Sequence, residues 1–381
     1  MSFFLSELVQ VSIGNRKFLT RPLSTDEWDT IYNTCELQKV LCVAFSGILK
    51  LPEEQMPPSE LLGKWQKVVL KEKERRGKVA EICRKACETH GKNGYNSCVL
   101  MPCGEYSDPK DVDILCWSKE KKEGQRTIVE YVNFQYVSST HHIKPKVVRN
   151  FTDIESGNIP MDVHFKSDYL NCPWYNNRFE AWVREMVERS FLPSSSIERE
   201  PEGDYISPLK MDSLPCEFYV VYQLLHLYRK LFCEGIRLGH LLEYYYTLSE
   251  FRGERTGAQP TVGNPMLITS EYVQSGARDR VMHIIECLGM KKFAGAVMYV
   301  MQTVFAMTDE FLICQPNQRN GSFVLSITLQ AGEYTRVIER TRTLSHLGRI
   351  GHHLYWLKRN RPFITQYPAE MFFELYKRMK G

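Results

Sequence analysis

The chain has 381 residues, 43% of them hydrophobic and 25% charged, a composition that is typical of a globular protein with two or three domains. Its formal net charge is +4, from 49 Lys and Arg against 45 Asp and Glu. A balance this mild excludes the strong overall positive field that would by itself indicate nucleic-acid binding, although it leaves room for a local basic surface.

Cysteine usage and the apolar segments indicate a protein of the cytoplasm. The 12 cysteines are irregularly spaced and form no CxxC pair, and residues 1–10 lack the basic and apolar regions of a signal peptide. We therefore expect reduced thiols and a cytoplasmic location. The most apolar segments, 217–228 and 294–307, are shorter than a bilayer span, so we expect two buried helices and no membrane partner.

Residues 1–92 are predicted to form an N-terminal helical region. Within residues 3–50, Ser24 or Thr25 can cap a helix that opens with two acidic residues. After three prolines, a long helix rich in Lys and Arg is predicted over residues 59–90. Its charged residues are expected to form a solvated face, and the alternative is a contact with phosphate.

The segment that follows contains a pair of carboxylates. A turn-rich stretch runs into Asp111, Val112 and Asp113 and then into apolar residues, which predicts a loop that enters a buried strand. Side chains alternate along a strand, so Asp111 and Asp113 point the same way, about 7 Å apart. Two carboxylates on one face repel each other unless a cation lies between them, which favours a divalent metal. The alternative is that Asp111 caps a turn while Asp113 is solvated at a strand edge.

A second polar strand is predicted nearby in the chain. Residues 140–148 and 159–165 are expected to be two strands, joined by a turn that contains Asp153, Ser156, Gly157 and Asn158.

Asp162 and His164 lie on one face of the second of these strands, while its apolar residues face the core. If this strand lies beside the strand of Asp113, Asp162 becomes a third carboxylate at the same metal. His164 is expected either to support the carboxylates by hydrogen bonding or to have a catalytic role. A separation of Asp162 from Asp111 and Asp113 of more than about 8 Å, too far for even a two-metal site, would exclude the enzyme.

Most of the remaining chain is predicted to be helical. Amphipathic or buried helices are expected at 174–191, 217–233, 270–290, 291–308 and around Tyr367. The sequence thus predicts an N-terminal helical region at 1–92, a core at 93–192 and a helical C-terminal domain at 193–381.

Nine motifs through most of the chain, taken in this order, resemble those of a bacterial family of uncharacterised nucleotidyltransferase-like proteins. This family is related by fold to polymerase-beta-type nucleotidyltransferases. The motifs are Trp28 with the helix to Ile48, YSDPKDVD at 106–113, HHI at 141–143, MDVHF at 161–165, NCPWYNNR at 171–178, LLHLY at 224–228, GIR at 235–237, EYYY at 243–246 and LGMKKF at 288–293.

The resemblance implies an α+β fold in which a small mixed β-sheet of nucleotidyltransferase type is embedded among helices, with a helical C-terminal half. It implies that Asp111 and Asp113 hold Mg²⁺ on a nucleoside triphosphate and that Asp162 is a third ligand or a base. Three further residues are assigned to cofactor binding, namely Gly104, Lys110 and His164.

The resemblance suggests a metal-dependent nucleotidyltransferase that moves a nucleotidyl group from a nucleoside triphosphate to an unknown acceptor. The chain departs from the family's pattern before the acidic pair: Pro102 has no N–H to donate to phosphate, and the loop is short, with Lys110 directly before Asp111. The alternative is therefore a catalytically degenerate relative that acts as a binding or scaffold protein. A nucleic-acid partner is a third hypothesis, based on the basic helix and the basic C-terminus.

Overall fold

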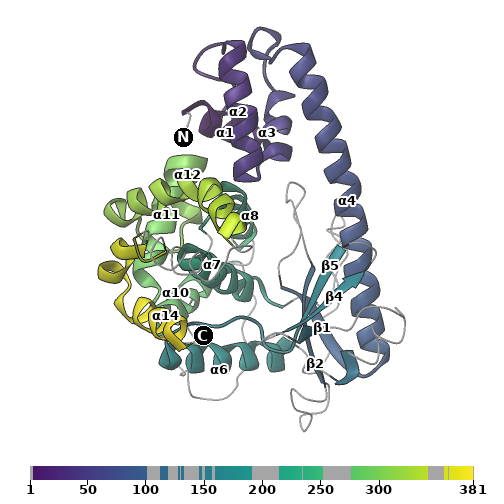
Figure 1. Ribbon diagram of the computed structural model, residues 1–381, viewed down its shortest axis with the longest axis vertical. Helices are drawn as coiled ribbons and strands as arrows, with labels where there is room; N and C mark the ends of the chain where they lie inside the picture. The colour runs from purple at the N-terminus through teal and green to yellow at the C-terminus, as the bar shows by residue number, and fades with distance from the viewer. Residues whose placement is uncertain are drawn as a thin grey trace. The chain divides into compact units, whose positions relative to one another are not determined.

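The computed structural model has an α+β fold, which confirms the predicted class (Figure 1). It describes residues 3–100, 112–118, 128, 130–132, 146–147, 151–156, 159–190, 214–233, 235–251, 276–341, 356–358 and 360–380. The helices are α1 (Phe3–Ser12), α2 (Thr25–Gln38), α3 (Leu41–Ile48), α4 (Ser59–Lys92), α6 (Pro173–Ser190), α7 (Cys216–Cys233), α8 (Leu238–Phe251), α10 (Ala277–Cys287), α11 (Lys291–Phe305), α12 (Gln318–Thr341) and α14 (Pro368–Lys380), with 3₁₀ turns at Glu53–Gln55 and Asp309–Phe311. The strands are β1 (Tyr95–Val99), β2 (Val112–Ser118), β3 (Lys146–Val147), β4 (Phe151–Ser156) and β5 (Ile159–His164).

The chain divides into two compact units, and both are discontinuous in sequence. One unit is helical and comprises Met1–Val69, Tyr169–Ala181 and Val220–Gly381, whereas the other contains the sheet and comprises Leu70–Asp168 and Trp182–Tyr219. The division between the units falls within α4, α6 and α7. The sequence regions 1–92, 93–192 and 193–381 stay a prediction of domains.

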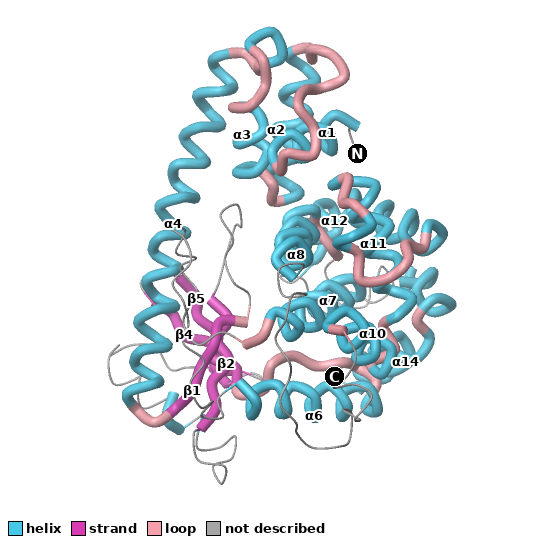
Figure 2. Tube along the Cα trace, turned by 180° about the vertical axis from the view of Figure 1, so that it is seen from behind, coloured by secondary structure: helices cyan, strands magenta, loops and turns pink. Residues whose placement is uncertain are grey.

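The sheet, whose strands are magenta in Figure 2, is mixed and has the strand order β1-β2-β5-β4-β3. β2 and β5 are parallel, and every other neighbouring pair is antiparallel. The predicted strand around Asp113 is confirmed as β2, and the predicted strand around Asp162 is confirmed as β5. The sheet therefore places these two acidic strands side by side at its centre.

The predicted turn at Asp153 and Ser156 is wrong, because both residues belong to strand β4. β4 pairs with β5 over six positions, from Phe151 opposite His164 to Ser156 opposite Ile159. Asp and Ser are typical of turns, but β4 also has aromatic and β-branched residues, which favour strands. The ladder with β5 outweighs the local preference of the polar residues for a turn.

Helix α4 covers one face of the sheet and buries its apolar side chains. The core between them includes Val79, Cys83 and Ala86 of α4 and, on the strands, Val112, Ile114, Cys116, Met161 and Val163, none more than 6% exposed. The predicted long helix is confirmed, and it ends where Gly94 takes a positive φ of 87°.

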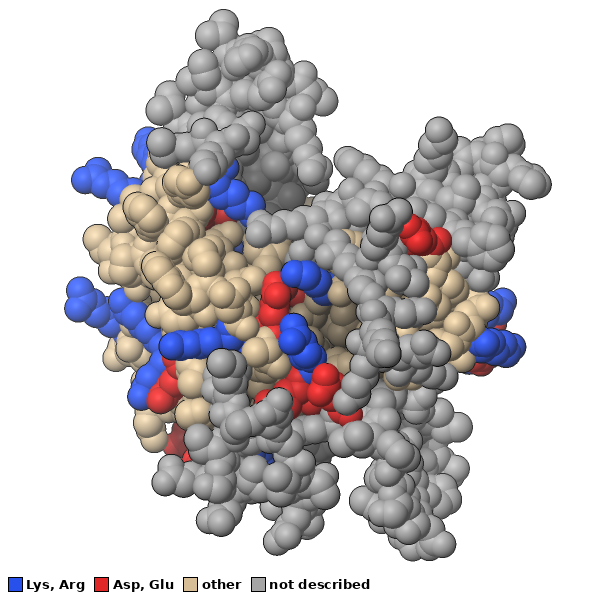
Figure 3. Space-filling model, turned by 90° about the horizontal axis from the view of Figure 1, so that it is seen from below, with Lys and Arg blue, Asp and Glu red and all other residues tan. Residues whose placement is uncertain are grey.

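The outer face of α4 bears interspersed charges of both signs. Lys78 pairs with Glu74 at 2.7 Å, and Arg84 pairs with Glu81 at 2.7 Å and with Glu88 at 2.6 Å. These are exposed pairs one turn apart, so solvent screens them and they contribute little to the stability of the helix. Near the middle of the molecular face in Figure 3, acidic and basic side chains of the described residues also lie side by side.

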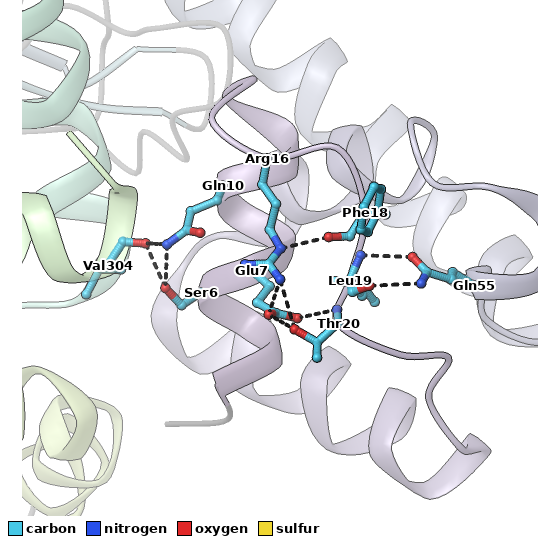
Figure 4. Close-up of polar contacts among 9 residues, drawn as sticks. All are labelled: Ser6, Glu7, Gln10, Arg16, Phe18, Leu19, Thr20, Gln55 and Val304. Atoms are coloured by element: carbon cyan, nitrogen blue, oxygen red, sulfur yellow. Dashed lines mark hydrogen bonds and ion pairs between the residues drawn. The ribbon is translucent and has the colours of Figure 1, made fainter. Parts of the chain in front are cut away.

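A partly buried polar network connects the N-terminal helices to the loop between α1 and α2 (Figure 4). The carboxylate of Glu7, whose side chain is 2% exposed, pairs with Arg16 at 2.6 Å and accepts the backbone N–H of Thr20 at 2.9 Å. Oε1 of Gln55 accepts a hydrogen bond from the N–H of Leu19 at 2.8 Å, and Nε2 of Gln55 donates one to the carbonyl of Leu19 at 2.9 Å. These bonds hold the loop between α1 and α2 and satisfy its buried polar groups.

The first helices belong to the same unit as the C-terminal helices. Ser6 and Gln10 of α1 both donate to the carbonyl of Val304 on α11, at 2.7 and 2.9 Å (Figure 4). Helix α3 also packs closely on α1, since a Cβ at Gly47 would lie 2.5 Å from the carbonyl oxygen of Leu8. The predicted N-cap of α2 is confirmed as Ser24 in a capping box with Glu27.

An aromatic core fills the other end of the helical unit. Tyr228 and Phe232 of α7 meet Tyr367 with ring centroids 5.3 and 5.8 Å apart. Nearby, the Glu370 carboxylate accepts hydrogen bonds from the backbone N–H groups of Asn171 and Cys172 at 2.8 and 3.1 Å. These bonds hold the two residues directly before α6. Burial raises the pKa of Glu370.

Among the described residues, no helix is both long and apolar enough to cross a membrane.

Candidate metal centre

The candidate centre lies on the two central strands of the sheet. Because β2 and β5 are parallel and in register, Asp113 stands opposite Asp162 and Leu115 stands opposite His164. Side chains two residues apart on a strand share a face, so all three polar side chains emerge on the same side. This is the side opposite α4, since Val112 and Met161 point into the core beneath that helix. The predicted alternation is therefore confirmed on β5, and on β2 Asp113 lies on the polar face.

The three polar side chains converge. One ligand atom from each of Asp113, Asp162 and His164 lies within 4.8 Å of the other two. Nε2 of His164 is 2.6 Å from Oδ1 of Asp113, a short charge-assisted contact. The side chains of His164 and Asp113 are 10% and 22% exposed, so the centre is sheltered but open to a small ion.

The backbone around Asp113 is held on both sides. The N–H of Leu100, which follows β1, donates to the carbonyl of Asp113 at 2.9 Å, and β5 pairs with the other edge of β2. The end of β1 is fixed in turn by Tyr219, whose hydroxyl donates to the carbonyl of Val99 at 3.2 Å. Burial raises the pKa of the Tyr219 hydroxyl, so this group stays a neutral donor. The centre is thus on rigid elements rather than on a loop.

The donor set fits a divalent cation. Two carboxylates and an imidazole within 4.8 Å of one another match the ligand types and spacing of a single bound ion. Without a cation, the negative charges of Asp113 and Asp162 face each other across one strand spacing, which is unfavourable. Among the described residues, these three form the one group of close acidic, cysteine or histidine side chains that can hold a metal.

Three of the predicted site residues are brought together and three fall outside the described residues. Asp113, Asp162 and His164 converge, and the Asp113–Asp162 separation is well inside the limit of about 8 Å beyond which two acids cannot share even a two-metal site. The predictions for Asp111, Gly104 and Lys110 concern residues outside the part of the chain that the structure describes.

Strand β4 adds a feature that sequence reasoning missed. Asp153 stands at the register position opposite Asp162, on the side of β5 away from β2. Phe151, Thr152 and Ile154 are aromatic or β-branched, and this composition was the signal for the strand.

Comparison with protein-family models, curated proteins and solved structures finds no match to this chain. The site is therefore interpreted from its own geometry.

Proposed function

We propose that this protein is a metal-dependent nucleotidyltransferase that moves a nucleotidyl group from a nucleoside triphosphate to an acceptor. The observation that supports the proposal is the convergence of Asp113 and Asp162 with His164 on adjacent parallel strands. Paired acids in this order are what the resemblance to nucleotidyltransferase-like proteins predicts. The small mixed sheet that bears them agrees with the same fold type.

The proposal assigns a role to each acidic residue. Asp113, with Asp111 before it in the sequence, holds the divalent ion, Mg²⁺ in the resembling family. Asp162 is the third ligand or the base that draws the attacking hydroxyl of the acceptor into line. A bound ion supplies neutralisation of the charge that develops on the transferred phosphorus and the leaving pyrophosphate. Nε2 of His164 lies 2.6 Å from the carboxylate of Asp113 and belongs to the same converging group.

Calorimetry tests the magnesium-dependent nucleotide binding that this function requires. The full chain is titrated with MgCl₂ and each nucleoside triphosphate, alongside Asp113→Asn and a control, Asp29→Asn, which changes an exposed aspartate on α2. We expect magnesium-dependent heat for the wild type and the control and none for Asp113→Asn. Circular dichroism checks that the variants are folded.

Equal heats for wild type and Asp113→Asn would contradict the proposal. The same samples are assayed for pyrophosphate, the leaving group of nucleotidyl transfer. Magnesium-dependent nucleotide binding without release of pyrophosphate from any triphosphate would indicate the degenerate relative that acts as a binding or scaffold protein. The sequence departure at Pro102 is the feature that favours this second outcome.

A further inference from the structure

The candidate centre contains a nitrogen donor in addition to its oxygen donors. Its three converging groups are two carboxylates and one imidazole, where the resemblance implies carboxylates alone. The imidazole of His164 is directed at the acids, because Nε2 itself, at the tip of the ring, lies 2.6 Å from Oδ1 of Asp113. His164 is 8% exposed, so the ring is held in the protein rather than in solvent.

The position of this ring is set by strands on both sides. His164 is the last residue of β5, opposite Leu115 of β2 on one side and Phe151 of β4 on the other. A residue paired in this way has little backbone freedom, and its place two residues after Asp162 puts both side chains on one face. The nitrogen is therefore preorganised beside the carboxylates.

The distances allow all three groups to bind one ion. A six-coordinate ion with bonds of about 2.1 Å separates adjacent ligands by about 3.0 Å and opposite ligands by about 4.2 Å. The three donor atoms lie within 4.8 Å of one another, close to this span. The 2.6 Å contact between His164 and Asp113 must widen by a few tenths of an ångström, roughly the change from hydrogen-bonded to adjacent ligand atoms. The Asp113 side chain is 22% exposed, which leaves it room for a rotation of this size.

We infer that His164 is a direct ligand and that it makes the centre selective for a first-row transition-metal ion, Mn²⁺, over Mg²⁺. Mg²⁺ prefers oxygen donors and retains its waters, whereas imidazole binds transition-metal ions well. Mn²⁺ accepts carboxylate and phosphate oxygens as readily as Mg²⁺ does, and it also takes a nitrogen ligand. The inference rests on the metal centre of the proposed function and specifies which ion that centre takes.

Electron paramagnetic resonance of Mn²⁺ tests the inference without any activity measurement. The full-length protein is titrated with MnCl₂, the loss of the free-ion signal gives the affinity, and competition with MgCl₂ gives the selectivity. Pulsed measurements on bound Mn²⁺ detect modulation from a coordinated ¹⁴N nucleus. We expect this modulation in the wild type and a preference for Mn²⁺ over Mg²⁺ of at least about tenfold, at the lower end of what a metal-site partner contributes.

Three variants assign the nitrogen. His164→Asp keeps three ligands but makes them all oxygen, so we expect ion binding to persist, the ¹⁴N modulation to disappear and the Mn²⁺ preference to fall towards unity. His164→Gln should lower Mn²⁺ affinity by at least about 10- to 100-fold, the loss that removal of an outer-shell partner already causes. The control His283→Gln removes an exposed histidine of α10 and should behave as the wild type does.

The outcomes separate this inference from the proposed function. Equal affinities for Mn²⁺ and Mg²⁺ without ¹⁴N modulation would overturn the role of His164 and leave a magnesium-dependent transferase standing. Modulation that survives in His164→Asp would overturn it as well, since the nitrogen would come from another group. Failure of both ions to bind would remove the metal centre, and the proposed function with it.

Discussion

The two faces of the central strands have opposite compositions and opposite surroundings. On one face, Val112 and Ile114 of β2 and Met161 of β5 are at most 2% exposed beneath α4. On the other face, one residue further along each strand, Asp113 and Asp162 stand opposite each other and meet His164. The comparison shows how a strand separates stability from chemistry: the apolar face fixes the backbone, and the backbone holds unfavourable like charges close together.

Two buried histidines of the sheet unit show the same contrast. His90 of α4 is 0% exposed and lies against Tyr131 with ring centroids 5.7 Å apart, and burial lowers its pKa to about 4. His164 is 8% exposed but has the Asp113 carboxylate at 2.6 Å. Burial favours the neutral ring of His90 in the core, whereas the Nε2 atom of His164 faces a carboxylate on the polar side of the sheet.

The largest expected effect is on the apolar face. Met161→Ala removes a side chain that is 1% exposed and leaves a cavity beneath α4, so we expect the free energy of unfolding to fall by about 2–5 kcal/mol. Urea denaturation followed by circular dichroism measures this loss. The control Leu70→Ala truncates a leucine of α4 that is 59% exposed and should change stability by less than about 0.5 kcal/mol. Equal effects of the two substitutions would contradict the division of faces.

An intermediate effect is expected from His90 as the pH falls. Its pKa is about 4 in the folded protein against an ordinary value of 6.5, so the unfolded chain takes up the proton first. The contribution of neutral His90 to the free energy of unfolding is fully present above about pH 6.5. It is lost as the pH falls towards 4, by about 2 kcal/mol at pH 5 and about 3 kcal/mol at lower pH.

Urea unfolding of wild type and His90→Gln between pH 7 and pH 4 measures this contribution. Glutamine does not titrate, so the difference in stability between the two proteins should narrow as the pH falls. A difference that is constant over this range would show that burial does not hold His90 neutral.

In the absence of divalent ions, the smallest change in the free energy of unfolding is expected for substitutions on the polar face. Asp162→Asn removes one of two carboxylates that stand opposite each other, and without divalent ions we expect a gain of about 0.2–1 kcal/mol. With Mn²⁺ at 100 times its dissociation constant, the wild type should gain about 2.7 kcal/mol and the variant should gain none. Thermal unfolding with chelator and with Mn²⁺ checks both statements. A large loss of stability in chelator would mean that Asp162 belongs to the structural core.

The local features of the sequence were sufficient for much of the fold. Ser24 followed three residues later by Glu27 is a capping box, and the structure has that cap. The alternation at 161–165 also placed Asp162 and His164 on the face away from the core. These predictions succeed because each depends on residues within one turn of helix or a few residues of strand.

Only the tertiary structure decided which strands are neighbours. His164 and Asp113 are 51 residues apart in the chain, and nothing in either segment specifies that β2 and β5 pair in parallel with Asp113 opposite Asp162. The turn predicted at Asp153 failed for a related reason, since pairing with β5 overrides the local preference of that residue. The sequence by itself determined which side chains share a face. The pairing of distant strands determined which faces meet, because that choice depends on burial beneath α4 and not on local propensity.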